Sequence, residues 1–216
     1  MSGEFSHWLV YDRKMTESDV SSDTEAAIMH ATYRALCANG YAETTISAIA
    51  EEFEKSKSLL YYHYDDKEAL LNDFLLFMLD ELESELGGEE DDPRERLWGV
   101  IDMLLPPESD EEAIQFRRAL LEARANAPHS ATYHEQFARS DELILDRLTE
   151  AIQYGVDRGA FHAVDTRETA EFLYSTAYGG LERGVTLDDD EPIRRTRDAV
   201  ASYLEDTVFC DDAGEP

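Results

Sequence analysis

Positive charge is scarce in this chain. Only four of its 216 residues are lysine, and its 19 lysines and arginines face 49 aspartates and glutamates, which gives a formal net charge of −30. The acidic residues are spread along the whole chain, so a detached acidic tail does not explain them. At molar salt the Debye length falls to about 3 Å, so a carboxylate-covered surface stays hydrated while its self-repulsion is screened. The composition therefore indicates a halophilic cytoplasm, with a halophilic archaeon as the expected host.

Cysteine and long apolar runs are also scarce. The two cysteines, Cys37 and Cys210, lie far apart and lack metal-ligand spacing, which favours a reducing compartment and inert thiols over a redox role. No apolar run approaches the roughly 20 residues needed to span a bilayer. The amino terminus lacks the pattern of a secretory signal. We therefore expect a soluble, cytoplasmic protein without a membrane partner.

The sequence motifs of common enzymes are missing as well. No Ser/His/Asp, phosphate-loop or dinucleotide-binding motif is found, and the many paired carboxylates are typical of a solvated surface. His129 and His134 are five residues apart, a spacing that does not place both imidazoles on one helical face, so we expect surface histidines rather than metal ligands. The sequence predicts no enzymatic activity, no cofactor and no metal.

Helix-start signals, by contrast, are abundant. An N-cap acceptor is followed three residues later by a carboxylate at Ser22–Glu25, Asp65–Glu68, Asp92–Glu95, Ser109–Glu112 and Asp165–Glu168. The alternating runs that are typical of strands are missing. The sequence therefore predicts an all-α fold with helices at about 23–39, 45–53, 56–63, 66–86, 93–105, 110–126, 130–158, 166–184 and 191–208.

Residues 44 to 71 contain two short helices joined by a tight turn, followed by the start of a long helix. In the first short helix, which Thr44 or Thr45 can cap, apolar residues recur every three or four positions, at Ile46, Ile49, Ala50 and Phe53. This arrangement is typical of a helix-turn-helix, whose second helix enters the major groove of DNA.

The second short helix is too polar and too aromatic to be a buried element. Ser56 is placed to cap it, so its free N–H groups and the positive end of its dipole would face an anion. Three of the four lysines, Lys55, Lys57 and Lys67, lie within residues 44–71, which favours contacts with phosphates. The residues that we expect to contact DNA are Thr44, Thr45, Ser56, Lys57, Ser58, Leu59, Tyr61, Tyr62, His63 and Lys67.

At these residues the sequence resembles the DNA-binding domain of the TetR family of transcriptional regulators. The family's helix-turn-helix pattern is met by Ile46, Ile49, Ala50, Ser56, Lys57, Leu60, Tyr61, His63, Tyr64, Lys67, Glu68, Ala69 and Leu70. The pattern of its first helix, with the glycine that ends it, is met by Ile28, Ala31, Leu36, Gly40 and Tyr41.

Three positions depart from the family pattern. Glu54 replaces the usual glycine of the turn, which can require positive φ, and Lys55 replaces an apolar residue. Leu59 replaces a small polar residue on the recognition helix. Two interpretations of Leu59 remain open: its methyl groups contact a thymine methyl in the major groove, or it turns inward and joins Leu60 in the core.

The lack of periodicity in residues 1–21 and the family resemblance together predict a division of the chain. Residues 1–21 form a flexible arm, residues 22–71 the DNA-binding domain, residues 72–210 an effector-binding and dimerisation domain, and residues 211–216 a tail. Residues 155–173 look like the family's junction before the dimerising helices. In this junction Gly155 and Gly159 end a long helix, Phe161 packs back and Asp165 caps the next helix.

By the same analogy, the helices at 166–184 and 191–208 form a four-helix bundle with a partner subunit. The small residues Ala177, Gly179 and Gly180 would let another helix approach closely, although they could instead fill the chain's own core. The expected interface residues are Tyr174, Ala177, Tyr178, Gly180, Leu181 and Tyr203.

Aromatic and methionine side chains of the larger domain are candidates for lining an apolar effector cavity. They are Trp98, Met103, Phe116, Tyr133, Phe137 and Tyr174, each of which could equally be plain core. The sequence thus predicts a homodimeric, TetR-like repressor that a small-molecule effector releases from its operator DNA. The alternative is a helical adaptor that has kept this fold and lost DNA binding. The acidic character of the DNA-binding domain favours this alternative, and the retained Lys57, Tyr61, His63 and Lys67 disfavour it.

Overall fold

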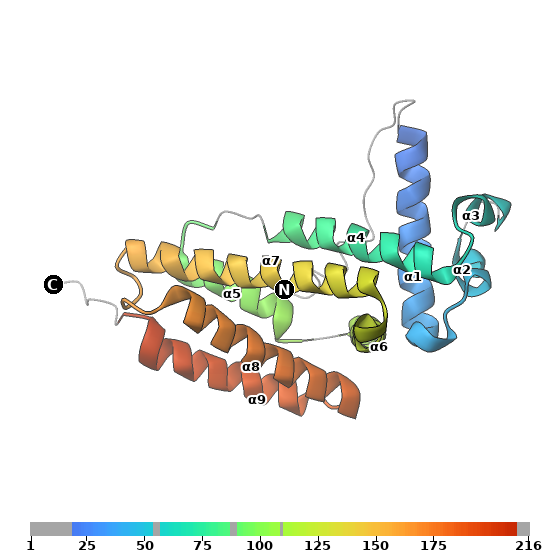
Figure 1. The fold of residues 1–216 in the computed structure, drawn as a ribbon. Helices are drawn as coiled ribbons and strands as arrows, with labels where there is room; N and C mark the ends of the chain where they lie inside the picture. Colours follow the sequence, from blue (N-terminus) through green and yellow to red (C-terminus); the bar gives the residue numbers. More distant parts are fainter. Residues whose placement is uncertain (1–18, 54–56, 87–89, 109, 211–216) are drawn as a thin grey trace. The chain divides into compact units, whose positions relative to one another are not determined.

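The computed structural model describes residues 19–53, 57–86, 90–108 and 110–210. Over these ranges the chain forms helices and no strand, which confirms the predicted all-α fold. The α-helices are α1 (Asp19–Glu43), α2 (Ile46–Glu52), α3 (Lys57–His63), α4 (Lys67–Glu85), α5 (Pro93–Leu104), α6 (Glu111–Ala125), α7 (Ala131–Asp157), α8 (Thr166–Leu187) and α9 (Glu191–Tyr203) (Figure 1). A 3₁₀ turn (η2, Ala127–His129) precedes α7, and a π turn (η3, Leu204–Val208) follows α9. None of the described helices is long and apolar enough to cross a membrane.

Two of the predicted helix caps are present as expected. The Asp92 carboxylate accepts hydrogen bonds from the backbone N–H groups of Arg94 at 2.8 Å and Glu95 at 3.1 Å, and Pro93 occupies the first helical position of α5. Asp165 likewise accepts from the Glu168 N–H at 2.9 Å. These caps satisfy backbone donors that have no acceptor within their own helix.

Three other predicted caps differ from the structure. α1 begins at Asp19, so Ser22 lies inside the helix rather than at its start, and the end of the predicted arm is helical; residues 1–18 lie outside the described residues. At the start of α4 the acceptor is Asp66, which binds the Ala69 N–H at 2.9 Å, and not Asp65.

α6 is capped by Asp110, which accepts from the Ala113 N–H at 2.7 Å, whereas the predicted cap Ser109 lies outside the described residues. At both α4 and α6 the acceptor stands one residue later than predicted. Two suitable acceptors are adjacent in the sequence, and helical periodicity alone does not choose between them.

The chain divides into two compact units. The first contains residues 1–79 and 108–136, and the second contains residues 80–107 and 137–216. This division by packing places α6 and the first turn of α7 in the same unit as α1 to α3. The division predicted from the sequence, at residue 71, follows the expected roles of the segments instead.

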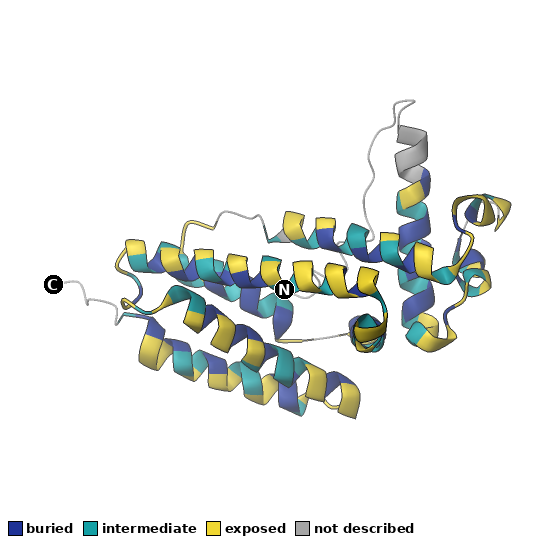
Figure 2. Cartoon of the chain, in the orientation of Figure 1, coloured by how far each residue is buried: buried dark blue, intermediate teal, exposed yellow. Residues whose placement is uncertain are grey.

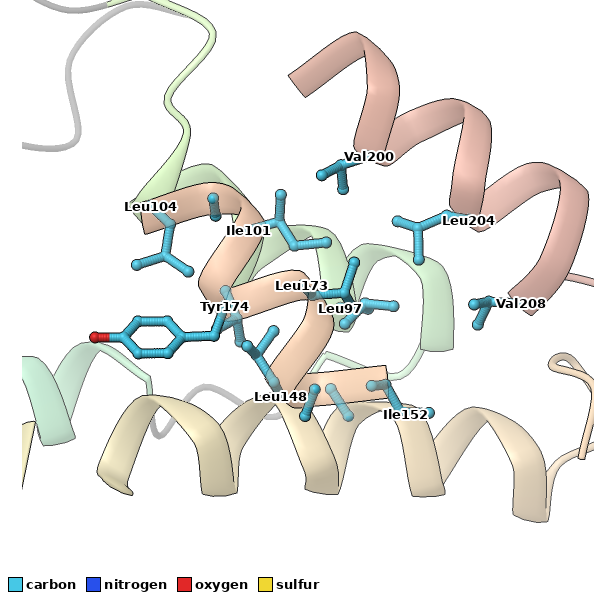
Figure 3. Packing of buried hydrophobic residues seen from close by; sticks show 14 of the residues in the cluster. Leu97, Ile101, Leu104, Leu148, Ile152, Leu173, Tyr174, Val200, Leu204 and Val208 are labelled. Atoms are coloured by element: carbon cyan, nitrogen blue, oxygen red, sulfur yellow. The ribbon is translucent and has the colours of Figure 1, made fainter. Parts of the chain in front are cut away.

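The second unit is built around one cluster of aliphatic side chains. Leu97, Leu148, Leu173 and Leu204, from four different helices, are almost fully buried in it (Figure 3). Along α8 and α9 buried positions alternate with exposed ones, as expected for helices with one face in a core (Figure 2). Tyr174 lies at the border of the cluster, where its ring extends away from the aliphatic side chains (Figure 3).

The junction between α7 and α8 corrects one prediction. Gly159 has φ +71° and follows the end of α7, as expected for a helix-ending glycine. Gly155, however, lies inside α7, where the ring of Phe161 covers it so closely that a side chain would not fit. Gly155 is therefore needed for the packing of Phe161 and not for ending the helix.

Candidate DNA-binding surface

The helix-turn-helix is fixed from inside by a small apolar core. Ile49, Ala50 and Phe53 of α2 and the following turn are buried, as predicted, and Leu60 of α3 is fully buried. Ile46 is only half-buried. Thr45 caps α2, since its hydroxyl accepts from the Ala48 N–H at 3.1 Å. Glu54, Lys55 and Ser56, on which the predicted atypical turn and the predicted cap of α3 depend, lie outside the described residues.

α3 presents most of its side chains to solvent, as its exposed colour in Figure 2 shows. Lys57, Ser58 and His63 are exposed, and the exposed fractions of Tyr61 and Tyr62 are 53% and 84%. Large aromatic residues are seldom left this exposed in a monomer, and on a short helix they indicate a contact surface. The hydroxyl, ammonium and imidazole groups beside them are donors suited to phosphates and base edges.

The burial of Leu59 is intermediate between what the two open interpretations expect, full exposure to DNA or full burial in the core. It is half-buried, whereas Leu60 beside it is fully buried. Part of its side chain is therefore accessible on the same helix that carries the exposed tyrosines.

Thr44 corrects the predicted set of DNA contacts. It is fully buried, and its hydroxyl donates to the backbone oxygen of Gly40 at 2.6 Å and lies 3.2 Å from that of Ala35. A buried hydroxyl that donates to a carbonyl oxygen near the end of α1 stabilises the end of that helix. Thr44 is thus a structural residue, and Thr45 next to it is exposed.

Lys67 is half-buried at the first position of α4 and is already engaged within the protein. Its Nζ donates to the backbone oxygen of Tyr41 and lies 4.4 Å from the centre of the Tyr41 ring. Burial lowers the pKa of Lys67, and the negative charges of Glu122 and Glu43 act in the opposite direction. These contacts hold the ammonium group in one place at the start of the helix that follows α3.

The six candidate effector residues fall in different compact units. Phe116 and Tyr133 belong to the first unit, where both are buried. The Phe116 ring packs against the tilted ring of Tyr33 and edge to face with Phe74, with centroid distances of 4.6 and 6.1 Å, which is a core role. The Tyr133 ring meets the Tyr41 ring edge to face at 6.3 Å.

The other four candidates belong to the second unit, and two of them have clear polar partners. The Tyr174 hydroxyl donates to Asp141 Oδ1 at 2.6 Å, and its ring lies 6.0 Å from that of Tyr178. The guanidinium of Arg197 lies 4.8 Å from the centre of the Trp98 ring. Met103 is partly buried against the aliphatic cluster, and Phe137 is half-buried near the start of this unit.

The predicted interface residues show why small side chains occur in α8. A Cβ at Gly180 would lie 2.4 Å from Thr196 Oγ1 of α9, so this glycine lets α9 of the same chain approach. Ala177 is buried in the same core, with Tyr174, while Tyr178, Leu181 and Tyr203 are partly buried against it. Packing within the chain therefore accounts for Ala177 and Gly180.

Sequence reasoning named Gly179 as a small residue that lets another helix approach, but it missed Phe172 on the outward-facing part of the same helices. Phe172 is 47% exposed and stacks on Tyr203 with a centroid distance of 4.6 Å, and Gly179 has no atom within 4 Å of the position where a Cβ would stand. The spacing of seven residues between Phe172 and Gly179, which places them on one face of a helix, is the sequence signal that could have identified this surface.

Neither histidine of the pair considered as metal ligands is buried: His129 and His134 are both exposed, as expected for surface residues. Across the described ranges no group of three or more His, Cys, Asp or Glu residues is placed to hold a metal ion.

Comparisons with known proteins identify two matching segments. Residues 28–74 match the family described as "Bacterial regulatory proteins, tetR family", and residues 93–208 match "BetI-type transcriptional repressor, C-terminal". None of the curated proteins matches the chain.

Among solved structures, a TetR transcription regulator from Haloarcula marismortui is 35% identical, with a TM-score of 0.77 over 87% of this chain and 99% of that one. A transcriptional regulator from Saccharomonospora viridis, solved in complex with choline, is 20% identical, with a TM-score of 0.73 over 88% of this chain and 100% of that one. A complex of SmeT with triclosan is 21% identical, with a TM-score of 0.66 over 90% of this chain and 95% of that one.

Proposed function

The chain belongs to the TetR family of transcriptional regulators, and from this premise we propose that it is a homodimeric repressor that a small molecule releases from its operator. The single observation that carries DNA binding is the exposed face of α3. There Tyr61, Tyr62 and His63 lie beside Lys57 on a helix anchored by the fully buried Leu60. A helical adaptor without DNA binding would have no use for these exposed donors, and an enzyme would need a catalytic group that the sequence does not offer.

Selection of DNA from a random duplex library with the purified protein, in buffer of high KCl concentration, tests this function. We expect one enriched sequence with two half-sites about 34 to 36 Å apart, one helical turn, since each subunit presents one recognition helix. Tyr61→Ala on the exposed face should abolish the enrichment. Equal, weak retention of all sequences by both proteins would favour the adaptor instead.

Repression and release are tested separately from DNA binding. A reporter gene placed behind the selected operator should be silenced by the protein and restored by the effector. Activation of the reporter by the protein would show that it is an activator and not a repressor, and the proposed DNA binding would still stand. The same proposal places the protein in the cytoplasm, where its operator is.

The proposed domain boundaries follow these roles. Residues 22–71 would bind DNA, and residues 72–210 would bind the effector and the second subunit, with residues 1–21 and 211–216 outside both.

For the dimer, the outward face of α8 and α9 is the proposed contact surface. Phe172, stacked on Tyr203, offers an apolar anchor, and the open position at Gly179 would let a partner helix approach. Phe172→Asp should convert the dimer to a monomer in sedimentation velocity, because two new carboxylates would be buried near each other. Ala138→Asp adds the same charge at an exposed position of α7, outside the proposed surface, and should leave the dimer intact. A monomeric wild-type protein would contradict the proposal.

For the effector, we propose a small apolar or amphipathic molecule bound by the domain that follows the DNA-binding head. Support comes from Asp141 and Tyr174, a hydrogen-bonded polar pair at the border of an aliphatic cluster, since ligand sites are mostly apolar with a few placed polar groups. Related proteins were solved with choline and with triclosan, a cation and an apolar compound, so both classes belong in the trial.

Thermal unfolding with candidate ligands tests the effector site. A ligand at a hundred times its Kd should add about 2.7 kcal/mol to the free energy of unfolding. Tyr174→Phe keeps the ring but removes the hydroxyl, so it should weaken a ligand that contacts the polar pair. If no compound of either class raises the unfolding temperature or releases DNA, the proposed regulation fails.

The halophilic host is proposed from the charge of −30 and from the Haloarcula relative. Exposed acidic groups such as the three successive aspartates 188–190 repel one another at low salt, and salt screens that repulsion. The midpoint of thermal unfolding should therefore rise with KCl up to molar concentrations. A midpoint that is independent of KCl would contradict this adaptation.

A further inference from the structure

The backbone of Tyr41 lies where the main part of α1 ends. Gly40 has φ 70° and ψ 174°, a conformation that breaks the helical path and that residues other than glycine rarely adopt. The N–H groups that follow Gly40 therefore resemble those at the start of a helix, which have no backbone acceptor of their own. Glu122 of α6 supplies the acceptor: its Oε2 is 3.0 Å from the Tyr41 nitrogen and 3.4 Å from the Ala42 nitrogen.

The carbonyl group of the same residue is held from a different helix. Lys67, the first residue of α4, donates its Nζ hydrogen to the Tyr41 oxygen and also lies over the Tyr41 ring. Tyr41 thus joins the carboxylate of Glu122 to the ammonium group of Lys67. The residues involved all belong to the first compact unit, which also contains α3.

We infer that Glu122 is a positioning residue for DNA binding, which fixes the backbone of Tyr41 and through it the ammonium group of Lys67. This inference rests on the proposed function, because Lys67 has a phosphate to bind only if the protein binds DNA. Without the carboxylate, the N–H groups of Tyr41 and Ala42 lose a charged acceptor. The turn after Gly40 then relaxes, and the Tyr41 oxygen no longer holds Lys67 in one place.

The position of Glu122 in the sequence gives no hint of this role. It lies eighty-one positions after Tyr41, on a helix outside the helix-turn-helix. As one acidic residue among 49, it would pass for part of the solvated surface.

A double-mutant cycle tests the inference, with affinity for the selected operator measured at one salt concentration. The proteins are the wild type, Glu122→Ala, Lys67→Ala and the double variant. We expect Glu122→Ala to weaken operator binding about tenfold, the size of a lost charge-assisted hydrogen bond. The double variant should bind no more weakly than Lys67→Ala alone, because Glu122 acts through Lys67.

Three further variants separate positioning from charge and stability. Glu122→Gln keeps an acceptor oxygen at the same reach and should recover most of the affinity. Glu111→Ala removes the same charge from the exposed first turn of α6 and should not weaken binding. If Glu122→Ala does not fold, Glu122→Asp keeps the charge, withdraws the carboxylate by one methylene group and enters the cycle in its place.

Additive losses in the cycle would overturn the inference, and so would a Glu122→Gln variant that is folded but as weak as Glu122→Ala. In either case the wild type still binds its operator, so the proposed function stands. A wild type that binds no DNA would overturn both.

Discussion

Phe161 lies against the backbone of Gly155 so closely that a Cβ at position 155 would stand 2.1 Å from Phe161 Cδ2. The ring of Phe161 is also stacked on Phe209, with a centroid distance of 5.0 Å. These contacts attach the segment between α7 and α8 to the residues that follow η3, within the core of the second unit.

Gly155→Ala should therefore destabilise the protein. The added methyl group must displace Phe161 from a packed site, which costs about 1–3 kcal/mol and lowers the unfolding midpoint by roughly 2–4 °C per kcal/mol at this chain length. Gly99→Ala is the matched control, since Gly99 lies in α5 with nothing within 4 Å of its Cβ position. It should stabilise the protein by about 0.5–1 kcal/mol. Equal midpoints for the two variants in calorimetry would contradict the packing described for Phe161.

Lys67→Ala should weaken binding to operator and to random DNA by the same factor. Phosphate contacts carry no sequence information, so the slope of log K against log salt concentration should fall in magnitude by about one. Fluorescence anisotropy over a series of KCl concentrations measures both quantities. Arg139→Ala, which removes one positive charge from an exposed position of α7, should leave the slope unchanged. An unaltered slope in Lys67→Ala would show that its ammonium group serves only Tyr41.

Leu59 should favour thymine at one position of each half-site. Its side chain is partly accessible on α3, and the thymine C5-methyl is the base feature in the major groove that rewards an apolar contact. Replacing thymine by uracil at each operator position should reduce affinity at one symmetric pair of sites. That loss should shrink in Leu59→Ala. Uniform tolerance of uracil would assign Leu59 to the core of the helix-turn-helix.

Cys37 should react slowly with alkylating reagents while the protein is folded. Burial raises the pKa of its thiol to about 11, and Glu112 and Asp110 add to the effect. Because the pKa of the Cys37 thiol is raised in the folded state, little thiolate is present at pH 8. Alkylation should become faster only as the pH approaches the raised pKa of about 11. Mass spectrometry of iodoacetamide-treated protein should show the Cys37 peptide labelled roughly a hundredfold more slowly than in urea-unfolded chain. Similar rates in both states would contradict the burial of this thiol.

The sequence by itself determined the helices and identified the helix-turn-helix. Caps such as Asp92 and Asp165 act over three residues, and apolar spacing such as that of Ile49 and Phe53 repeats within two turns. Both signals are local, so the sequence alone shows them. The exposed donors of α3 were predicted for the same reason, because the buried Leu60 fixes which side of so short a helix faces inward.

Only the tertiary structure decided how individual side chains are used. The Thr44 hydroxyl donates to the Gly40 oxygen of α1, Gly180 accommodates Thr196 of α9, and Glu122 reaches Tyr41 across a separation of eighty-one residues. Each depends on a partner brought close by the packing of another helix, and no local pattern records that partner. The prediction of Asp65 as the cap of α4 was wrong for the same reason: Asp66 is the acceptor, and adjacent carboxylates are chemically equivalent until the backbone conformation at each is fixed.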